Sequence, residues 1–150
     1  MIVYLDSSVI VRAYLADEEG HHEAVTLMND PGVAAITGTW TRVEVSGALV
    51  RAVRSGRANG EPDEQGLLAL LDADLGIDGP VTVVGVPQDQ VEAEALSIVR
   101  SHGLRAMDAW HLAVARITIP SLVEVGEERA FASRDRDQRI VADELGFRTL

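Results

Sequence analysis

The chain has 150 residues, no cysteine and a formal net charge of −11 at pH 7; this length fits one domain, and the absence of cysteine excludes disulfide scaffolds, thiolate zinc sites and cysteine nucleophiles. All of its basic residues are arginine, which excludes Schiff-base lysines and the P-loop lysine. The acidic balance, taken alone, argues against nucleic-acid binding, because phosphate binding depends on cation density.

Apolar runs alternate with helical patterns along the chain. Short runs rich in β-branched residues predict strands, and apolar residues at helical spacing predict helices. In chain order we predict a strand at 2–5, helices at 8–16 and 22–29, a strand at 33–37, a helix from 39 to about 55, a helix that starts with GEPD (60–63), a strand at 81–86, helices at 88–101 and 106–117, a strand at 129–133, a helix at 136–145 and a final strand at 147–150. Pro120 is expected to break the chain, so 118–128 is predicted to be a loop.

Continuous apolar strands that alternate with helices are typical of a parallel sheet covered on both faces. We therefore predict an α/β fold, a three-layer α/β/α sandwich around a central parallel sheet of four to five strands. In such open sheets, ligands bind at the carboxyl ends of the strands.

The start of the chain predicts neither a leader nor an anchor. Only four apolar residues separate Met1 from Asp6, which is too few for the apolar part of a signal peptide. No apolar run approaches the roughly 20 residues of a membrane span. We expect a cytoplasmic protein with one domain over residues 1–150 and no membrane partner.

Four acidic residues interrupt apolar segments of the sequence. Asp6 follows the first predicted strand, and Asp135 follows the strand at 129–133. Glu44 and Asp108 stand near the heads of the helices at 39–55 and 106–117. In a parallel sheet, all four positions lie at the same edge.

Helix capping is the alternative explanation for each acid. Asp6 and Asp135 are placed to cap the helices that follow them. Asp108 would be a cap if its helix starts late, and Glu44 would be the acid of a first-turn capping arrangement. A capping role and a ligand role do not exclude each other, but capping does not explain why four acids share one edge.

Carboxylates crowded at one edge must either take up protons or hold a cation at pH 7. Oxygen ligands suit Mg²⁺ or Mn²⁺, each of which keeps several waters in its shell. We therefore expect a metal site to which the first strand delivers Asp6, with Ser7 and Ser8 capping the helix or bonding the metal waters.

The four acidic motifs resemble those of PIN-domain nucleases. These motifs are Asp-Ser-Ser after the first strand, the VEV glutamate, the MDAWHLAVA aspartate and the SRDRD stretch. Their order and the chain length resemble the toxin ribonucleases of VapBC toxin–antitoxin pairs, from Asp6 to the terminal GFRTL. Two departures are a more polar segment before Glu44 and a second aspartate, Asp137, in the fourth motif. Asp135 matches the family position better than Asp137, but the choice stays open.

The resemblance implies a single PIN domain that acts as an Mg²⁺-dependent endoribonuclease. The metal, Mg²⁺ or Mn²⁺, would be held by Asp6, Glu44, Asp108 and Asp135, and it would activate a water for attack on a phosphodiester. The family also implies a cognate antitoxin partner and a homodimer. The alternative is a catalytically silent PIN-like module that binds RNA or a protein.

Several arginines could meet RNA phosphates, for which the guanidinium is well suited. Arg42 and Arg51 lie on the helix that carries Glu44, and Arg134 and Arg136 flank the fourth motif. Solvated helix faces are the alternative for each of them. His111, three residues after Asp108, is expected to be a hydrogen-bonded helix histidine rather than a general base.

Overall fold

The computed structural model describes residues 1–58 and 62–150. In chain order, its elements are β1 (Ile2–Leu5), α1 (Ser7–Tyr14), α2 (His21–Asn29), β2 (Ala34–Gly38), α3 (Trp40–Arg54), α4 (Glu64–Asp74), β3 (Val81–Val84), α5 (Gln88–His102), α6 (Ala106–Leu122), β4 (Arg129–Ala132), α7 (Arg136–Glu144) and β5 (Arg148–Thr149). Gly60 and Glu61, in the GEPD segment predicted to start a helix, lie outside the described residues, and α4 begins after its cap residue Asp63. None of the helices in the described ranges is long and apolar enough to cross a membrane.

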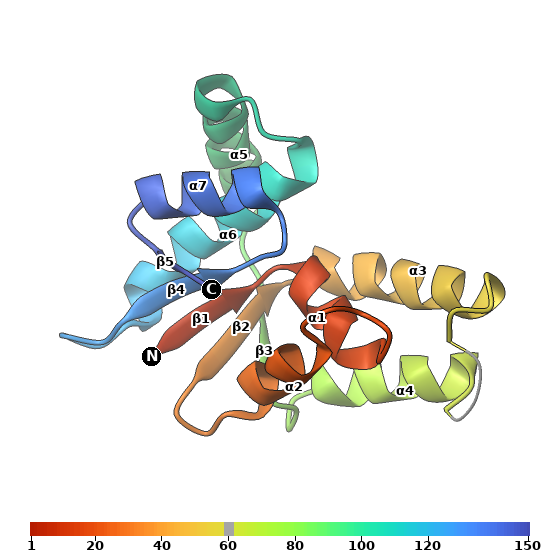
Figure 1. Cartoon of the computed structure of the whole chain (residues 1–150). Coiled ribbons are helices and arrows are strands. Elements are labelled where there is room, and N and C mark those ends of the chain that lie inside the picture. The colour runs from red at the N-terminus through yellow and green to blue at the C-terminus, as the bar shows by residue number, and fades with distance from the viewer. Residues whose placement is uncertain (59–61) are drawn as a thin grey trace.

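The five strands form one parallel sheet in the order β3-β2-β1-β4-β5. The chain starts in the middle with β1, builds β2 and β3 on one side, and then returns to add β4 and β5 on the other (Figure 1). The strand order therefore reverses between β1 and β4. Ligands of open α/β sheets bind outside the carboxyl ends of the strands at such a reversal.

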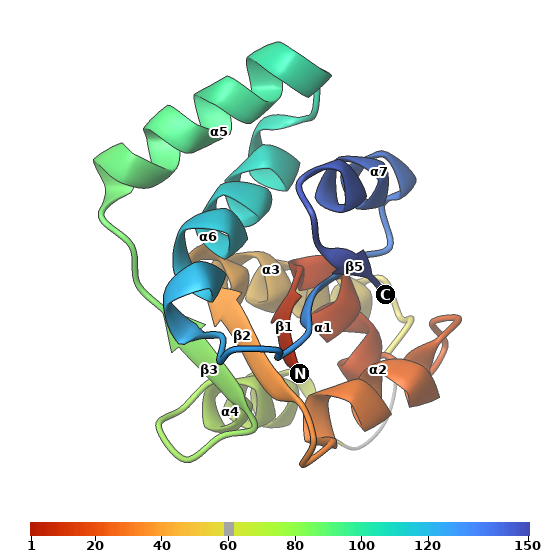
Figure 2. The same cartoon turned by 90° about the vertical axis from the view of Figure 1, so that its left-hand side faces the viewer.

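Both faces of the sheet are buried, as continuous apolar strands require. Side chains alternate along each strand, so Tyr4 and Phe131 face α5, α6 and α7, while Val3 and Leu5 face α1 to α4. Figures 1 and 2 show these two groups of helices on opposite sides of the sheet. The predicted three-layer α/β/α sandwich is confirmed.

The loop predicted at 118–128 is wrong in its first part, because α6 continues through Pro120 to Leu122. Proline removes one helical hydrogen bond and its ring crowds the carbonyl four residues earlier, but Pro120 stands in the last turn of α6, so only two helical residues follow it. Ile119 is fully buried in the core, and its carbonyl accepts a hydrogen bond from Val123 N at 3.0 Å. Burial of Ile119 before the proline and the hydrogen bond from Val123 N after it therefore hold the last turn of the helix.

Candidate active site

Asp6 directly follows β1 and is the N-cap residue of α1. Its Oδ2 accepts hydrogen bonds from Ser8 N at 3.1 Å and from Ser8 Oγ at 2.5 Å. Its Oδ1 lies 3.6 Å from His111 Nε2, and the residue is only 5% exposed. One oxygen thus caps the helix while the other faces the site, so the two explanations for Asp6 are compatible.

Asp135 repeats this arrangement after β4. Its Oδ1 accepts hydrogen bonds from Asp137 N at 2.9 Å and Gln138 N at 3.0 Å, which caps α7. Its Oδ2 accepts a hydrogen bond from Arg105 Nη2 at 2.5 Å. Asp137 is exposed and contributes its backbone N–H to this cap.

Capping does not account for Glu44 or Asp108. Helix α3 begins at Trp40 and has no acid in its first turn, so Glu44 lies beyond it. Helix α6 begins at Ala106, which places Asp108 inside the first turn rather than at the cap. Both carboxylates are bonded to side chains instead: Glu44 Oε2 lies 2.6 Å from His111 Nε2, and Asp108 Oδ2 accepts from Arg105 Nε at 2.8 Å.

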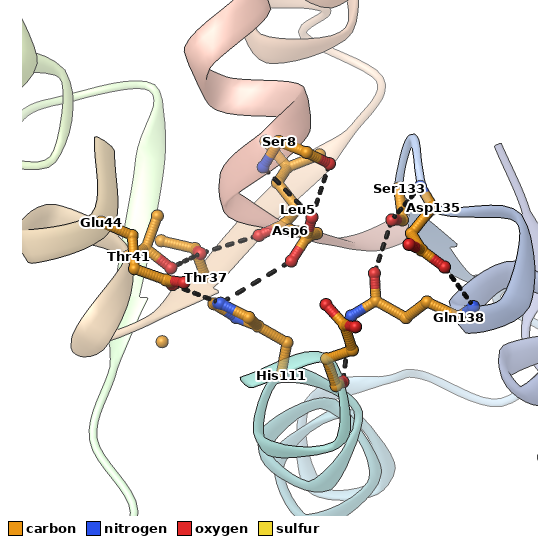
Figure 3. A network of polar contacts seen from close by, with 12 residues as sticks. Leu5, Asp6, Ser8, Thr37, Thr41, Glu44, His111, Ser133, Asp135 and Gln138 are labelled. Atoms are coloured by element: carbon orange, nitrogen blue, oxygen red, sulfur yellow. Dashed lines mark hydrogen bonds and ion pairs between the residues drawn. The ribbon is translucent and has the colours of Figure 1, made fainter. Parts of the chain in front are cut away.

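All four carboxylates line one pocket of about 360 Å³, which we call the acidic pocket. It opens at the carboxyl ends of β1 and β4, where the strand order reverses. Its walls are Asp6, Glu44, Asp108 and Asp135, joined by Ser7, Ser8, Arg105, His111 and Arg134. Figure 3 shows three side chains pointing toward one another: Asp6 from the end of β1, Glu44 from α3 and His111 from α6. The structure therefore brings together four acids that are up to 129 positions apart in the chain.

His111 is 1% exposed and connects the acidic pocket to the core. Its Nδ1 lies 2.9 Å from the Tyr4 hydroxyl, and its Nε2 faces Glu44. Burial lowers the pKa of His111, but the hydrogen bond to Glu44 and the charges of nearby carboxylates outweigh it, so the pKa of the imidazole is raised. The hydrogen-bonded helix histidine expected from the sequence is present, and its partner is a site carboxylate.

Arg105 was not among the site residues predicted from the sequence. Its guanidinium bridges Asp108 and Asp135, which come from different elements. Its hydrogen bond to Asp108 and the charges of both partners raise the pKa of Arg105. Burial raises the pKa of Asp108, and Arg105 offsets part of that rise. The available signal was its position three residues before Asp108, one helical turn away.

Buried polar side chains hold the walls of the pocket in place. Thr37 Oγ1 donates to Leu5 O at 2.8 Å and lies 2.6 Å from Thr41 Oγ1, which fixes the start of α3 beside β1. Gln138 Nε2 donates to Asp108 O at 3.0 Å, and its Oε1 accepts from Ser133 Oγ at 2.5 Å. None of these residues was predicted to support the site, because a single polar residue in a strand, loop or helix carries no sign of its distant partner.

Among the four arginines predicted to meet RNA, Arg134 lines the acidic pocket. Arg42 donates to Asp72 at 2.8 Å and to Leu75 O at 3.1 Å, so it joins α3 to α4. Arg51 and Arg136 are exposed and do not line the acidic pocket. Of the four arginines, Arg42, Arg51 and Arg136 therefore do not line the acidic pocket.

The donors of the acidic pocket fit a hard divalent cation, because they are carboxylate oxygens with serine hydroxyls beside them. Within residues 1–58 and 62–150, however, no group of three or more acids or histidines is arranged to hold a metal ion. Arg105 draws Asp108 and Asp135 to itself, and His111 holds Glu44. The Arg105 guanidinium thus bridges two of the four carboxylates and offsets their mutual repulsion, which is what a bound metal ion would also do.

The family model described as PIN domain matches residues 3–144, which is nearly the whole chain. No curated protein matches the chain.

Proposed function

Because the chain belongs to the PIN domain family, we propose that it is a metal-dependent endoribonuclease that hydrolyses phosphodiester bonds of cellular RNA. PIN domains are generally nucleases and typically use divalent metal ions. The observation that carries the proposal is the convergence of Asp6, Glu44, Asp108 and Asp135 on one pocket at the carboxyl edge of the sheet.

In this proposal, Asp6 Oδ1 and the carboxylates of Glu44, Asp108 and Asp135 hold Mg²⁺ or Mn²⁺. The bound ion would lower the pKa of a water and offset charge on the phosphate. His111 keeps Glu44 oriented toward the pocket, and Ser8 keeps Asp6 oriented through its two hydrogen bonds. Ser7 also lines the pocket, where its hydroxyl can bond a metal-bound water.

We also propose that the protein is the toxin of a toxin–antitoxin pair, neutralised by a cognate antitoxin in the cytoplasm. The order of the acidic motifs and the chain length support this role. A homodimer and a single PIN domain over residues 1–150 belong to the same proposal. Exposed apolar side chains on α3, Trp40 at 48% and Val43 at 62%, support an interface there.

Metal-dependent cleavage tests the proposed function. The purified chain, stripped with EDTA, should leave a mixed RNA pool intact and should cut it when Mg²⁺ or Mn²⁺ is restored. At tenfold excess over its Kd, the ion should also stabilise the fold by about 1.4 kcal/mol, because it binds the native state alone. Asp108→Asn, purified identically, controls for a contaminating nuclease. Metal and RNA binding without any cleavage would favour the silent PIN-like module.

Replacing Arg105 with glutamine is expected to raise the affinity of the acidic pocket for Mn²⁺ several-fold. The Arg105 guanidinium bonds Asp108 and Asp135, so it competes with a metal for the same oxygens. The melting temperature in EDTA should fall, because the two carboxylates lose their only bridging cation among the described residues.

Calorimetric titration with Mn²⁺ and thermal melting in EDTA measure both effects of Arg105→Gln. Arg100→Gln is the matched control, since this exposed arginine on α5 lines none of the pockets described. Weaker Mn²⁺ binding by Arg105→Gln would show that Arg105 supports the metal instead of competing with it.

A further inference from the structure

A second pocket, of about 350 Å³, borders the acidic pocket. It lies between α1, α2 and the segment that runs from the end of β4 into α7. Three arginines line it, Arg12, Arg134 and Arg139, against one acid, Glu23, and we call it the arginine pocket. Arg134 lines both pockets, so the two are neighbours. The lining of this pocket is thus richer in arginine than in acids, although the chain as a whole has a net charge of −11.

Arg12 has a buried side-chain nitrogen, Nε, that lacks a hydrogen-bond partner among the described residues. Burial lowers the pKa of Arg12, and the nearby charges of Arg134 and Arg139 lower it further, against Glu18 and Glu19, which raise it. A partly buried cation beside two like charges favours an anionic partner for its unbonded Nε–H.

Of the three guanidinium groups, that of Arg134 already has an ion-pair partner, whereas Arg12 packs against backbone. Gly20 approaches Arg12 so closely that a Cβ there would lie 2.8 Å from Nη1, and its φ of +81° also favours glycine. Arg139 forms no ion pair with any residue in the described ranges, and its side chain is exposed. Arg134 is paired with Glu18, which Arg57 also contacts at 2.7 Å. Two of the three guanidinium groups are therefore free to bind a ligand.

We propose that Arg12, Arg134 and Arg139 form a phosphate subsite, which binds a backbone phosphate of the RNA next to the one that the acidic pocket acts on. The inference rests on the proposed function and names how the substrate is held. Guanidinium groups match phosphate oxygens in pairs. A strand that crosses the acidic pocket must continue past its rim, and Arg134 stands on the rim that both pockets share.

The experiment measures the salt dependence of RNA binding in EDTA, where the RNA stays intact. Fluorescence anisotropy of a short single-stranded RNA is recorded over a series of salt concentrations for wild type, Arg12→Gln and Arg100→Gln. Losing one phosphate contact should reduce the slope of log K against log salt by about 0.7. Arg12→Gln should show that reduction and bind several-fold more weakly, whereas Arg100→Gln, which removes the same charge on α5, should match wild type.

Arg139→Gln guards against a folding artefact, because this side chain is exposed. It should reduce the slope as Arg12→Gln does, and inorganic phosphate should raise the melting temperature of wild type more than that of either variant. Unchanged slopes in both variants would overturn the phosphate subsite, even if the protein cuts RNA. Reduced slopes in a protein that never cuts RNA would support the subsite while the proposed nuclease function fails. Phosphate binding with an unchanged RNA slope would overturn it, since the anion would then belong to another ligand.

Discussion

Asp6→Asn should lower metal-dependent RNA cleavage at least about 100-fold, because loss of residues that merely support a metal ligand already costs about 10–100-fold. Asparagine keeps the oxygen that accepts from Ser8 N, and asparagine caps helices as well as aspartate does. It removes one carboxylate charge from the acidic pocket. Stability in EDTA should therefore stay within about 1 kcal/mol of wild type, while Mg²⁺ affinity falls steeply.

Asp63→Asn is the matched control for this change. Asp63 caps α4 as Asp6 caps α1, with Gly66 N donating to its Oδ1 at 2.8 Å, but it does not line the acidic pocket. Thermal melting with and without Mg²⁺, together with cleavage of a mixed RNA pool, should leave Asp63→Asn indistinguishable from wild type. Full cleavage by Asp6→Asn would remove Asp6 from the mechanism and most of the reason for assigning a nuclease.

The elements that the sequence predicted well are those whose pattern is local. The strand at 2–5 reads as an unbroken apolar run because both faces of the sheet are covered, and the structure places β1 at Ile2–Leu5. Asp6 could be found because it directly follows such a run, and Asp135 because it stands three residues after the last residue of β4. The parallel sheet then brings them to one edge without further information.

The features that the sequence could not predict depend on tertiary contacts. Helix α6 passes through Pro120 because Ile119 is buried, and propensity alone does not contain that packing. Arg105 reaches Asp135, 30 positions away, and only the folded chain brings their elements together. Whether Glu44 or Asp108 caps a helix depends on the residue at which that helix begins. A sequence pattern locates this residue only approximately.

His111→Leu should weaken Mn²⁺ binding about 10–100-fold, because His111 holds the Glu44 carboxylate in position although it does not itself bind the metal. It should also lower the free energy of unfolding by about 1–3 kcal/mol, the cost of an unsatisfied buried polar group. That group is the Tyr4 hydroxyl, which is fully buried and has His111 Nδ1 at 2.9 Å. His102→Leu, at the end of α5, is the control: it removes a surface contact with Glu144 at 3.2 Å, which is worth at most about 1 kcal/mol, and it should leave the Mn²⁺ affinity unchanged.

Two further variants separate these effects, because the two ring nitrogens have different partners. Gly38 N donates to the Tyr4 oxygen at 3.0 Å, so the Tyr4 O–H can donate to Nδ1 while Nε2–H faces Glu44. Glutamine at position 111 places an N–H near the Nε2 site, and asparagine places an acceptor near the Nδ1 site. His111→Gln should therefore retain most of the Mn²⁺ affinity but have a lower free energy of unfolding. His111→Asn should retain most of the free energy of unfolding but bind Mn²⁺ more weakly. Equal loss of Mn²⁺ affinity in both would show that His111 does not act through Glu44.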